Sequence, residues 1–123
     1  MAEVVVRTQT HVMNANDTYI LRWPHNNSPL SRPYTLVCHI EDASDDGSYS
    51  VHARPQGSTA AFEPIVYQSL HLNNAVGTGA LVSTAITDDS LIAVEADGLE
   101  IALIRAGGTT GASTLTMSVS QMA

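Results

Sequence analysis

Apolar and polar residues alternate most clearly in the last quarter of the chain. Two apolar runs within residues 91–105 flank the pair Asp97-Gly98, which readily takes the positive φ angles of a two-residue hairpin turn. After a glycine-rich stretch, the apolar residues of 114–120 alternate with threonine and serine, which predicts a strand with one dry and one wet face. We therefore expect a three-stranded meander that closes the chain.

The opening of the chain has the same period of two. Residues 4–13 carry Val4, Val6, Thr8, Thr10 and Val12 on one side, which predicts a first strand, with an extended arm as the alternative. Further strands are expected over residues 18–23, 34–41, 48–54, 62–72 and 80–87.

An acidic turn separates two of these strands. Residues 42–47 are rich in aspartate and end in Gly47, so residues 34–54 are expected to form a hairpin. Pro64 has no backbone N–H to donate, so the strand over 62–72 is expected to begin at a sheet edge.

About eight or nine short strands separated by turns, without a convincing helix, predict an all-β fold. The expected architecture is a two-sheet antiparallel β-sandwich or jelly roll of about eight strands. A chain of 123 residues fits one domain, so we expect a single β-sandwich domain over residues 1–123. Residues 1–10 would form its edge strand or an extended arm.

One long loop interrupts the pattern. Residues 24–33 contain three prolines and little apolar content, which excludes a helix or a central strand there. A loop of this length is uncommon in a small domain unless it binds something. It is either a contact segment or a plain connection stiffened by proline.

Charge narrows the classes of partner. The formal net charge is −7, from twelve acidic residues against five arginines, and the chain has no lysine. Nucleic acid is therefore not expected as a partner, because binding it requires neutralising phosphates. The amino terminus lacks a secretory pattern and no apolar run is long enough to span a bilayer, so we expect a soluble chain made in cytosol, without a membrane partner.

Candidate metal ligands occur in two places. The acidic turn could gather oxygen ligands for calcium, but it lacks the spacing of the twelve-residue calcium loop. His39 and His52 lie on the two arms of the expected hairpin, where some registers would set them opposite each other as a two-nitrogen site requires. No third ligand accompanies them, so we expect no metal and no cofactor.

Catalytic patterns are similarly weak. Cys38 and His39 are neighbours, but neighbours along a strand point to opposite faces and cannot form a nucleophile–base pair. Cys38 is the only cysteine, and its apolar surroundings predict a buried small side chain. The Gly-x-Ser-x-Gly signature is absent from the sequence. We therefore expect no enzymatic activity and no catalytic residues.

The closing segment, residues 97–121, resembles the terminal hairpins of small virion proteins of tailed bacteriophages. The richness of the whole chain in alanine, serine, threonine and glycine is similar in style. This resemblance implies a capsid decoration or cement protein with a β-sandwich or jelly-roll fold, often a homotrimer. Such a protein would sit on the outer capsid surface of a virion made in host cytoplasm, where it would brace the major capsid protein or other virion subunits.

The sequence itself suggests which residues would bind a partner. Val4, Val5, Val6 and Arg7 could add a strand to a neighbouring chain, because an exposed edge offers unpaired backbone groups. Two arginines near the long loop could meet acidic patches on a partner. These are Arg22 and Arg32.

Two other functions stay open. The chain could be a glycan or host-surface binding module that uses the loop at 24–33 with the neighbouring Trp23, although the few aromatic residues are expected mainly in packing roles. It could also be a neck or tail component of a virion.

Overall fold

A computed structural model describes residues 4–21, 33–42, 47–107 and 112–122. This part of the chain is all-β and forms two antiparallel sheets. The strands are β1 (Val4–Met13), β2 (Thr18–Ile20), β3 (Tyr34–Asp42), β4 (Gly47–Pro55), β5 (Glu63–Pro64), β6 (Tyr67–Leu72), β7 (Ala75–Val76), β8 (Leu81–Val82), β9 (Ser90–Ala96), β10 (Leu99–Gly107) and β11 (Ser113–Met122).

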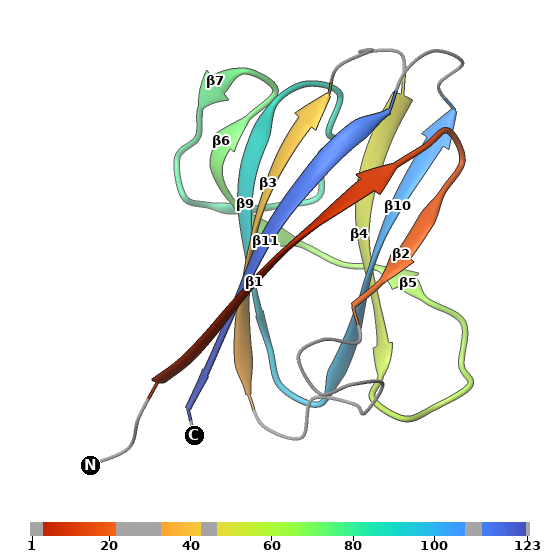
Figure 1. The fold of residues 1–123 in the computed structure, drawn as a ribbon, viewed down its shortest axis with the longest axis vertical. Coiled ribbons are helices and arrows are strands. Elements are labelled where there is room, and N and C mark those ends of the chain that lie inside the picture. Colours follow the sequence, from red (N-terminus) through yellow and green to blue (C-terminus); the bar gives the residue numbers. More distant parts are fainter. Residues whose placement is uncertain (1–3, 22–32, 43–46, 108–111, 123) are drawn as a thin grey trace.

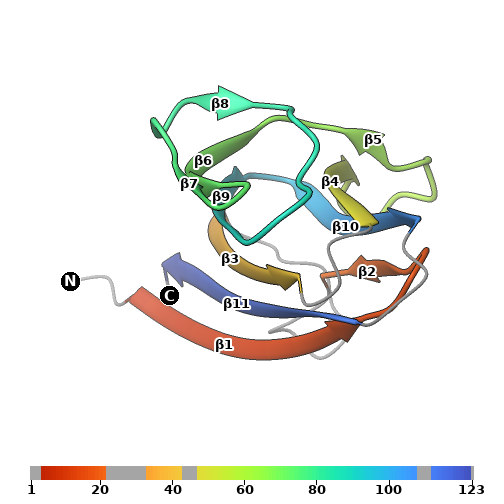
Figure 2. The same cartoon turned by 90° about the horizontal axis from the view of Figure 1, so that it is seen from above.

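The two sheets pack face to face as a sandwich (Figure 1). The seven-stranded sheet has the order β1-β11-β3-β9-β6-β7, with β8 also paired to β6, and the four-stranded sheet has the order β2-β10-β4-β5. Figure 2 shows β1 as the outermost strand on its side of the molecule, next to β11. The sequence-based prediction of a two-sheet antiparallel fold is confirmed.

Strand pairing is nested from the ends of the chain inwards. β1 pairs with β11, β2 with β10, β3 with β9 and β4 with β5. The chain is therefore one long antiparallel ribbon folded over into two sheets, which is the winding of a jelly roll. Strands β6, β7 and β8 are an addition between β5 and β9 that widens one sheet, and we call residues 65–89 the extension.

Both hairpins predicted from the sequence are wrong in their pairing. β9 belongs to the seven-stranded sheet and β10 to the four-stranded sheet, so the Asp97-Gly98 turn connects the two sheets. β3 and β4 likewise lie in different sheets. The predicted closing meander fails for the same reason, because β11 pairs with β1 and β3 rather than with β10. A turn-forming residue pair specifies a change of direction, but the partner of each strand is chosen by the global winding.

Two predicted strands are also shorter than expected. The strand over 62–72 is split into β5 and β6, because the chain crosses from one sheet to the other between them. Pro64 does lie in an edge strand, as predicted. Of residues 80–87, only β8 and a single bridge between Ile86 and Tyr49 are paired.

The core lies between the sheets and follows the alternation in the sequence. Leu115, Met117 and Val119 are buried on the dry side of β11, as the pattern predicts, and Tyr49 and Val51 face them from the other sheet. The largest fully buried apolar side chains are Tyr49, Tyr67, Met13, Leu36, Ile40, Ile86, Ile92, Ile101, Leu103, Leu115 and Met117. Each such side chain contributes about 1.5 to 3 kcal/mol of transfer free energy.

One cation is buried with the core. Arg105 is only 1% exposed, donates from Nη1 to the carbonyl oxygen of Met13 at 3.0 Å and lies over the ring of Tyr49. Through these contacts Arg105, on β10, joins the end of β1 to the four-stranded sheet.

Candidate functional site

Strand β1 forms one edge of the seven-stranded sheet. Its backbone pairs with β11 in an unbroken antiparallel register from Val4–Met122 to Met13–Ser113. No other strand in the described part of the chain pairs with β1. About half of its backbone N–H and C=O groups therefore point away from the sheet, because an antiparallel strand alternates its hydrogen bonds between its two sides.

The outward face of β1 combines apolar and hydroxyl side chains. Val6, Thr8, Thr10 and Val12 are all exposed, and Val6 and Val12 are 54% and 55% exposed. The alternation is regular because the register with β11 contains no bulge. This edge is long and apolar enough to accept another strand.

β1 has few of the features by which proteins protect a sheet edge, its one charged arginine, Arg7, being the exception. Natural edges are blunted by lysine, proline, a bulge or short length. Residues 4–13 contain no lysine and no proline. By contrast, β2, β5 and β7 have only two or three residues each, and β5 ends in Pro64.

The partner-binding residues predicted from the sequence fall partly on this edge. Val4, Val5, Val6 and Arg7 all lie in β1, where their backbone pairs with β11. Arg7 is exposed. Their role in binding remains a prediction.

The two other predicted arginines, Arg22 and Arg32, lie outside the described residues, as do residues 24–32 of the long loop. Thr8, Thr10 and Val12 complete the same exposed edge and were not proposed from the sequence. The signal for them was present, since the period of two runs through all ten residues.

The end of β1 turns a corner onto the four-stranded sheet. The rings of His11 and Tyr19 lie against each other at a tilt of 32° with their centroids 4.3 Å apart, and Nε2 of His11 lies 3.7 Å from Oδ2 of Asp17. Asn16 fixes the turn, because its side-chain oxygen accepts a hydrogen bond from the Gly107 N–H at 2.9 Å. The corner thus places one acidic group beside the inner face of β1.

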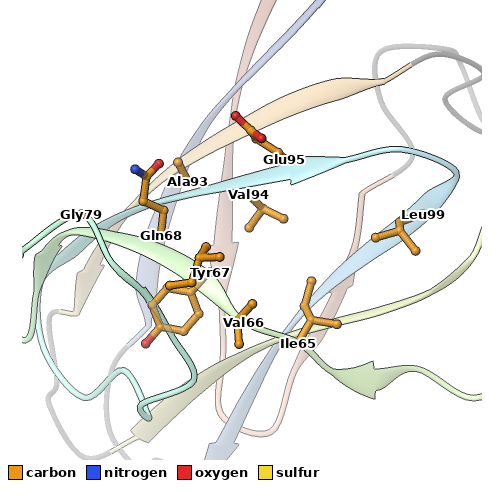
Figure 3. A pocket seen from close by; sticks show the side chains of 10 residues that line it. Ile65, Val66, Tyr67, Gln68, Gly79, Ala93, Val94, Glu95 and Leu99 are labelled. Atoms are coloured by element: carbon orange, nitrogen blue, oxygen red, sulfur yellow. The ribbon is translucent and has the colours of Figure 1, made fainter.

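A pocket of about 500 Å³ opens where β6 and β9 part. Figure 3 shows Val94 of β9 and Leu99 of β10 on one side and Ile65 and Val66 on the other. Pairing of β6 with β9 begins only at Gln68, so the strands leave a gap before it. The lining is mainly apolar, which suits an apolar side chain or ligand better than polar chemistry.

The extension beside this pocket carries exposed apolar side chains. Val76 and Leu81 are 88% and 69% exposed, and Val66 and Leu70 are exposed to a smaller degree. Exposed apolar patches often mark contact surfaces. The extension is therefore a second candidate contact surface, at the opposite end of the sheet from β1.

The histidine side chains considered as catalytic or metal-binding groups lie in different sheets. His39 lies in the seven-stranded sheet and His52 in the four-stranded sheet. The hairpin that would have set these two histidines opposite each other does not form. Oγ of Ser50 lies 2.7 Å from Nε2 of His52, but Nδ1 of His52 has no hydrogen-bond partner among the described residues. A serine–histidine pair without a third group to orient the imidazole is not a catalytic triad.

Cys38 is buried, as predicted, and lies on the face opposite to His39. Burial raises the pKa of the Cys38 thiol to about 12. The thiolate is the nucleophilic form, so this cysteine is unreactive near neutral pH.

Among the described residues, no group of three or more histidine, cysteine, aspartate or glutamate side chains could hold a metal ion. The aspartates of the acidic turn at 43–46 lie outside those residues. In the same part of the chain, no helix is long and apolar enough to span a membrane.

Comparisons of the chain with protein-family models, with curated proteins and with solved structures find no match.

Proposed function

We propose that this chain is a non-enzymatic structural protein of a virion. In this proposal it decorates and stabilises the capsid of a tailed bacteriophage through protein–protein contacts, and β1 is the edge that joins it to a neighbouring chain. The observation that carries the proposal is the ten-residue edge of β1, which has no second strand partner in the described part of the chain. Such an edge is a hazard for a solitary protein, because it is a template for pairing with another strand.

Strand addition gives this edge a physical means of binding. An added strand forms main-chain hydrogen bonds along the edge, and pockets between alternate side chains supply selectivity. Each hydrogen bond contributes about 0.5 to 1.5 kcal/mol net. The regular exposure of Val6, Thr8, Thr10 and Val12 adds side-chain contacts on one face.

The virion assignment rests on the resemblance of residues 97–121 to phage virion proteins. The jelly-roll winding agrees with the fold that the resemblance implies, but one fold can carry many functions. The partner in this proposal is the major capsid protein or another virion subunit, and the chain itself is a homo-oligomer. The resemblance implies a trimer on the outer capsid surface.

Sedimentation with shells tests this function. The chain would be expressed with the major capsid protein encoded in its own genome, and assembled shells would be separated on a density gradient. We expect the chain to travel with the shells and to raise their unfolding temperature. A chain that stays at the top of the gradient, or a genome without a capsid gene, would contradict the proposal.

A substitution tests the edge better than a truncation does. Deleting residues 1–10 is expected to abolish assembly and shell binding, but it would also uncover β11 as a new edge. The double variant T8E/T10E keeps β1 in place and puts two carboxylates on its exposed face. The matched control, T116E/S118E, adds the same charge to the same face on β11, one strand in from the edge.

The other functions considered have distinct tests. Glycan or host-surface binding through residues 24–33 falls on a segment that is mostly outside the described residues. A glycan array that responds to the chain and not to Trp23→Ala would favour it. A neck or tail component would sediment with tails rather than with shells.

A further inference from the structure

The middle of β1 reads nearly the same in both directions. Residues 6–12 are Val-Arg-Thr-Gln-Thr-His-Val, centred on Gln9. A two-fold axis through Gln9 would make β1 pair with β1 of a second copy in antiparallel orientation, since such an axis reverses the strand and keeps each face of the sheet on its own side.

In this register, like side chains meet on the outward face. Val6 lies opposite Val12 of the second copy and Thr8 lies opposite Thr10, and the axis repeats each pair. Two opposed threonines can hydrogen-bond to each other across the strands, and two opposed valines bring apolar side chains together. All four side chains are exposed in the single chain, so the pairing would bury the part of their surface that faces the second copy.

Other registers lose this match. A slip by one residue would place the outward face of one copy beside the inward face of the other. A slip by two residues would pair Val6 with Thr10, or Thr8 with Val12, in place of a valine pair and a threonine pair. Of these registers, only the one about Gln9 pairs like side chains at all four exposed positions.

Charge on the inward face agrees with the same register. Arg7 would lie opposite His11 of the second copy, whose ring is 3.7 Å from a carboxylate oxygen of Asp17. Arg7 is exposed and has no ion-pair partner among the described residues. The two-fold axis would bring the Arg7 guanidinium of each copy close to the Asp17 carboxylate of the other copy.

We propose that β1 binds β1 of a second copy of this chain, antiparallel and centred on Gln9, so that two seven-stranded sheets become one continuous sheet. The inference rests on the proposed function, since it names the partner of the same edge. A contact of this kind joins identical surfaces and closes after two copies. It therefore makes a two-fold dimer, in place of the three-fold ring that the resemblance implies.

Cysteine cross-linking tests the register directly. At the axis, Gln9→Cys places two thiols on directly opposed residues, whose Cα atoms are about 4.5 to 5.5 Å apart in antiparallel sheets. That separation is within the range of a disulfide. The native Cys38 is buried and does not compete. We expect mild oxidation to convert most of the Q9C variant into a covalent dimer.

The matched control is Arg7→Cys. Residue 7 lies four positions away from residue 7 of the other copy, about 13 Å along the strands, which is too far for a disulfide. The R7C variant alone should therefore stay uncross-linked, while a mixture of R7C and H11C should form the covalent heterodimer. A Q9C variant that stays monomeric under oxidation would overturn the proposal, as would equal cross-linking of Q9C and R7C.

Charge reversal provides an independent test that leaves the fold in place. T8E/T10E puts glutamate opposite glutamate across the axis and should weaken the dimer at least tenfold, and T8K/T10K should do the same with lysine. An equimolar mixture of the two should form dimers again, because each glutamate then faces a lysine. A mixture that stays monomeric, while each variant has a native circular dichroism spectrum, would contradict the register.

Failure of this inference can be told apart from failure of the proposed function. If Q9C does not cross-link but the chain still travels with shells, β1 joins a different protein and the proposed function stands. If Q9C cross-links and the chain ignores shells, the dimer stands and the virion assignment is wrong.

Discussion

Arg54 and Glu100 form a nearly buried ion pair on the outer face of the four-stranded sheet. Nε and Nη2 of Arg54 donate to Oε2 of Glu100 at 3.1 and 2.8 Å, and the guanidinium also lies 4.3 Å from the centroid of the Phe62 ring. The Gly57 N–H donates to the other carboxylate oxygen at 3.3 Å. The pair thus ties the loop after β4 to the start of β10.

Replacing Arg54 with methionine would leave the Glu100 carboxylate buried without its partner. We expect the free energy of unfolding to fall by about 2 to 4 kcal/mol, below the value for a fully buried pair because Arg54 remains partly exposed. Urea denaturation measures this loss. Adding Glu100→Gln to the same variant removes the stranded charge and should restore part of the stability; no recovery would mean that the ion pair is not the cause.

Buried ionisable residues make the fold sensitive to alkali. Burial raises the pKa of Cys38 from 9.0 to about 12, and burial together with the charge of Glu100 raises the pKa of Tyr34 above its ordinary 10.0. Between the ordinary and the raised pKa, the unfolded chain has lost a proton that the folded chain keeps, so stability falls as pH rises.

We therefore expect these groups to leave the free energy of unfolding unchanged below about pH 9. Above that pH, the free energy of unfolding should fall by about 1.4 kcal/mol per pH unit for each group that titrates. In Cys38→Ala the decline should begin near pH 10, where tyrosines of the unfolded chain begin to lose their protons. Urea midpoints at pH 8, 9.5 and 11 measure the difference between the two proteins. Identical pH profiles would show that Cys38 does not titrate in this way.

At the scale of single elements, the extension depends on a close contact between backbones. Gly77 donates its N–H to the Leu70 carbonyl at 3.0 Å, and the Gly79 N–H donates to Ser69 at 2.7 Å. A methyl group on residue 77 would collide with the Ser69 carbonyl group. Only glycine lets the chain after β7 lie this close to β6.

Gly77→Ala should therefore detach the segment after β7 from β6 and cost about 1 to 3 kcal/mol locally. Hydrogen exchange is the suitable measurement, because it reports local opening. The amides of residues 77 and 79 should exchange faster, while those of β3 and β11 should not change. Val76→Ala, at a neighbouring exposed position, is the control, and equal effects in both variants would argue against the steric reason.

The position of individual strands was largely predictable, and their partners were not. Residues 114–120 show in one dimension which side chains are buried, and Leu115, Met117 and Val119 are buried in the structure. Asp97-Gly98 marks a turn correctly, with Gly98 at φ +70°. The alternation shows which side of a strand is buried, but it does not show which strand lies beside it. The sequence therefore predicts a hairpin at Asp97-Gly98, whereas the turn connects the two sheets.

The candidate site was predictable to the same degree. Residues 4–7 are predicted to add a strand to a neighbour because an exposed edge offers unpaired backbone groups, and β1 is an edge strand in the structure; their binding role stays a prediction. The pocket between β6 and β9 could not be foreseen, because it depends on where two strands part. The separation of His39 from His52 could not be foreseen either, since it follows from the jelly-roll winding.

For the whole molecule, the nested winding puts the first and last strands side by side at one end of a sheet. That arrangement leaves β1 with no strand on its other side in the described part of the chain, and this is the side that we propose joins a copy of the chain.

Mass in solution should reflect this arrangement. By light scattering, the native chain should approach twice the monomer mass of 13.0 kDa as its concentration rises. T8E/T10E should stay at 13.0 kDa, and T116E/S118E should behave as the native chain. A native chain that is monomeric at every concentration would contradict assembly of the isolated chain, and a trimer would contradict the two-fold contact.

Hydrogen exchange along β1 tests the central claim most directly, since the claim is that this edge is where the chain joins another protein. In the isolated monomer, alternate amides of residues 4–13 should exchange rapidly, because they point away from β11. In the assembled form, whether with a second copy or on a shell, the account predicts that these same amides become protected. Amides that still exchange rapidly in the assembled form would show that β1 is not the joining edge.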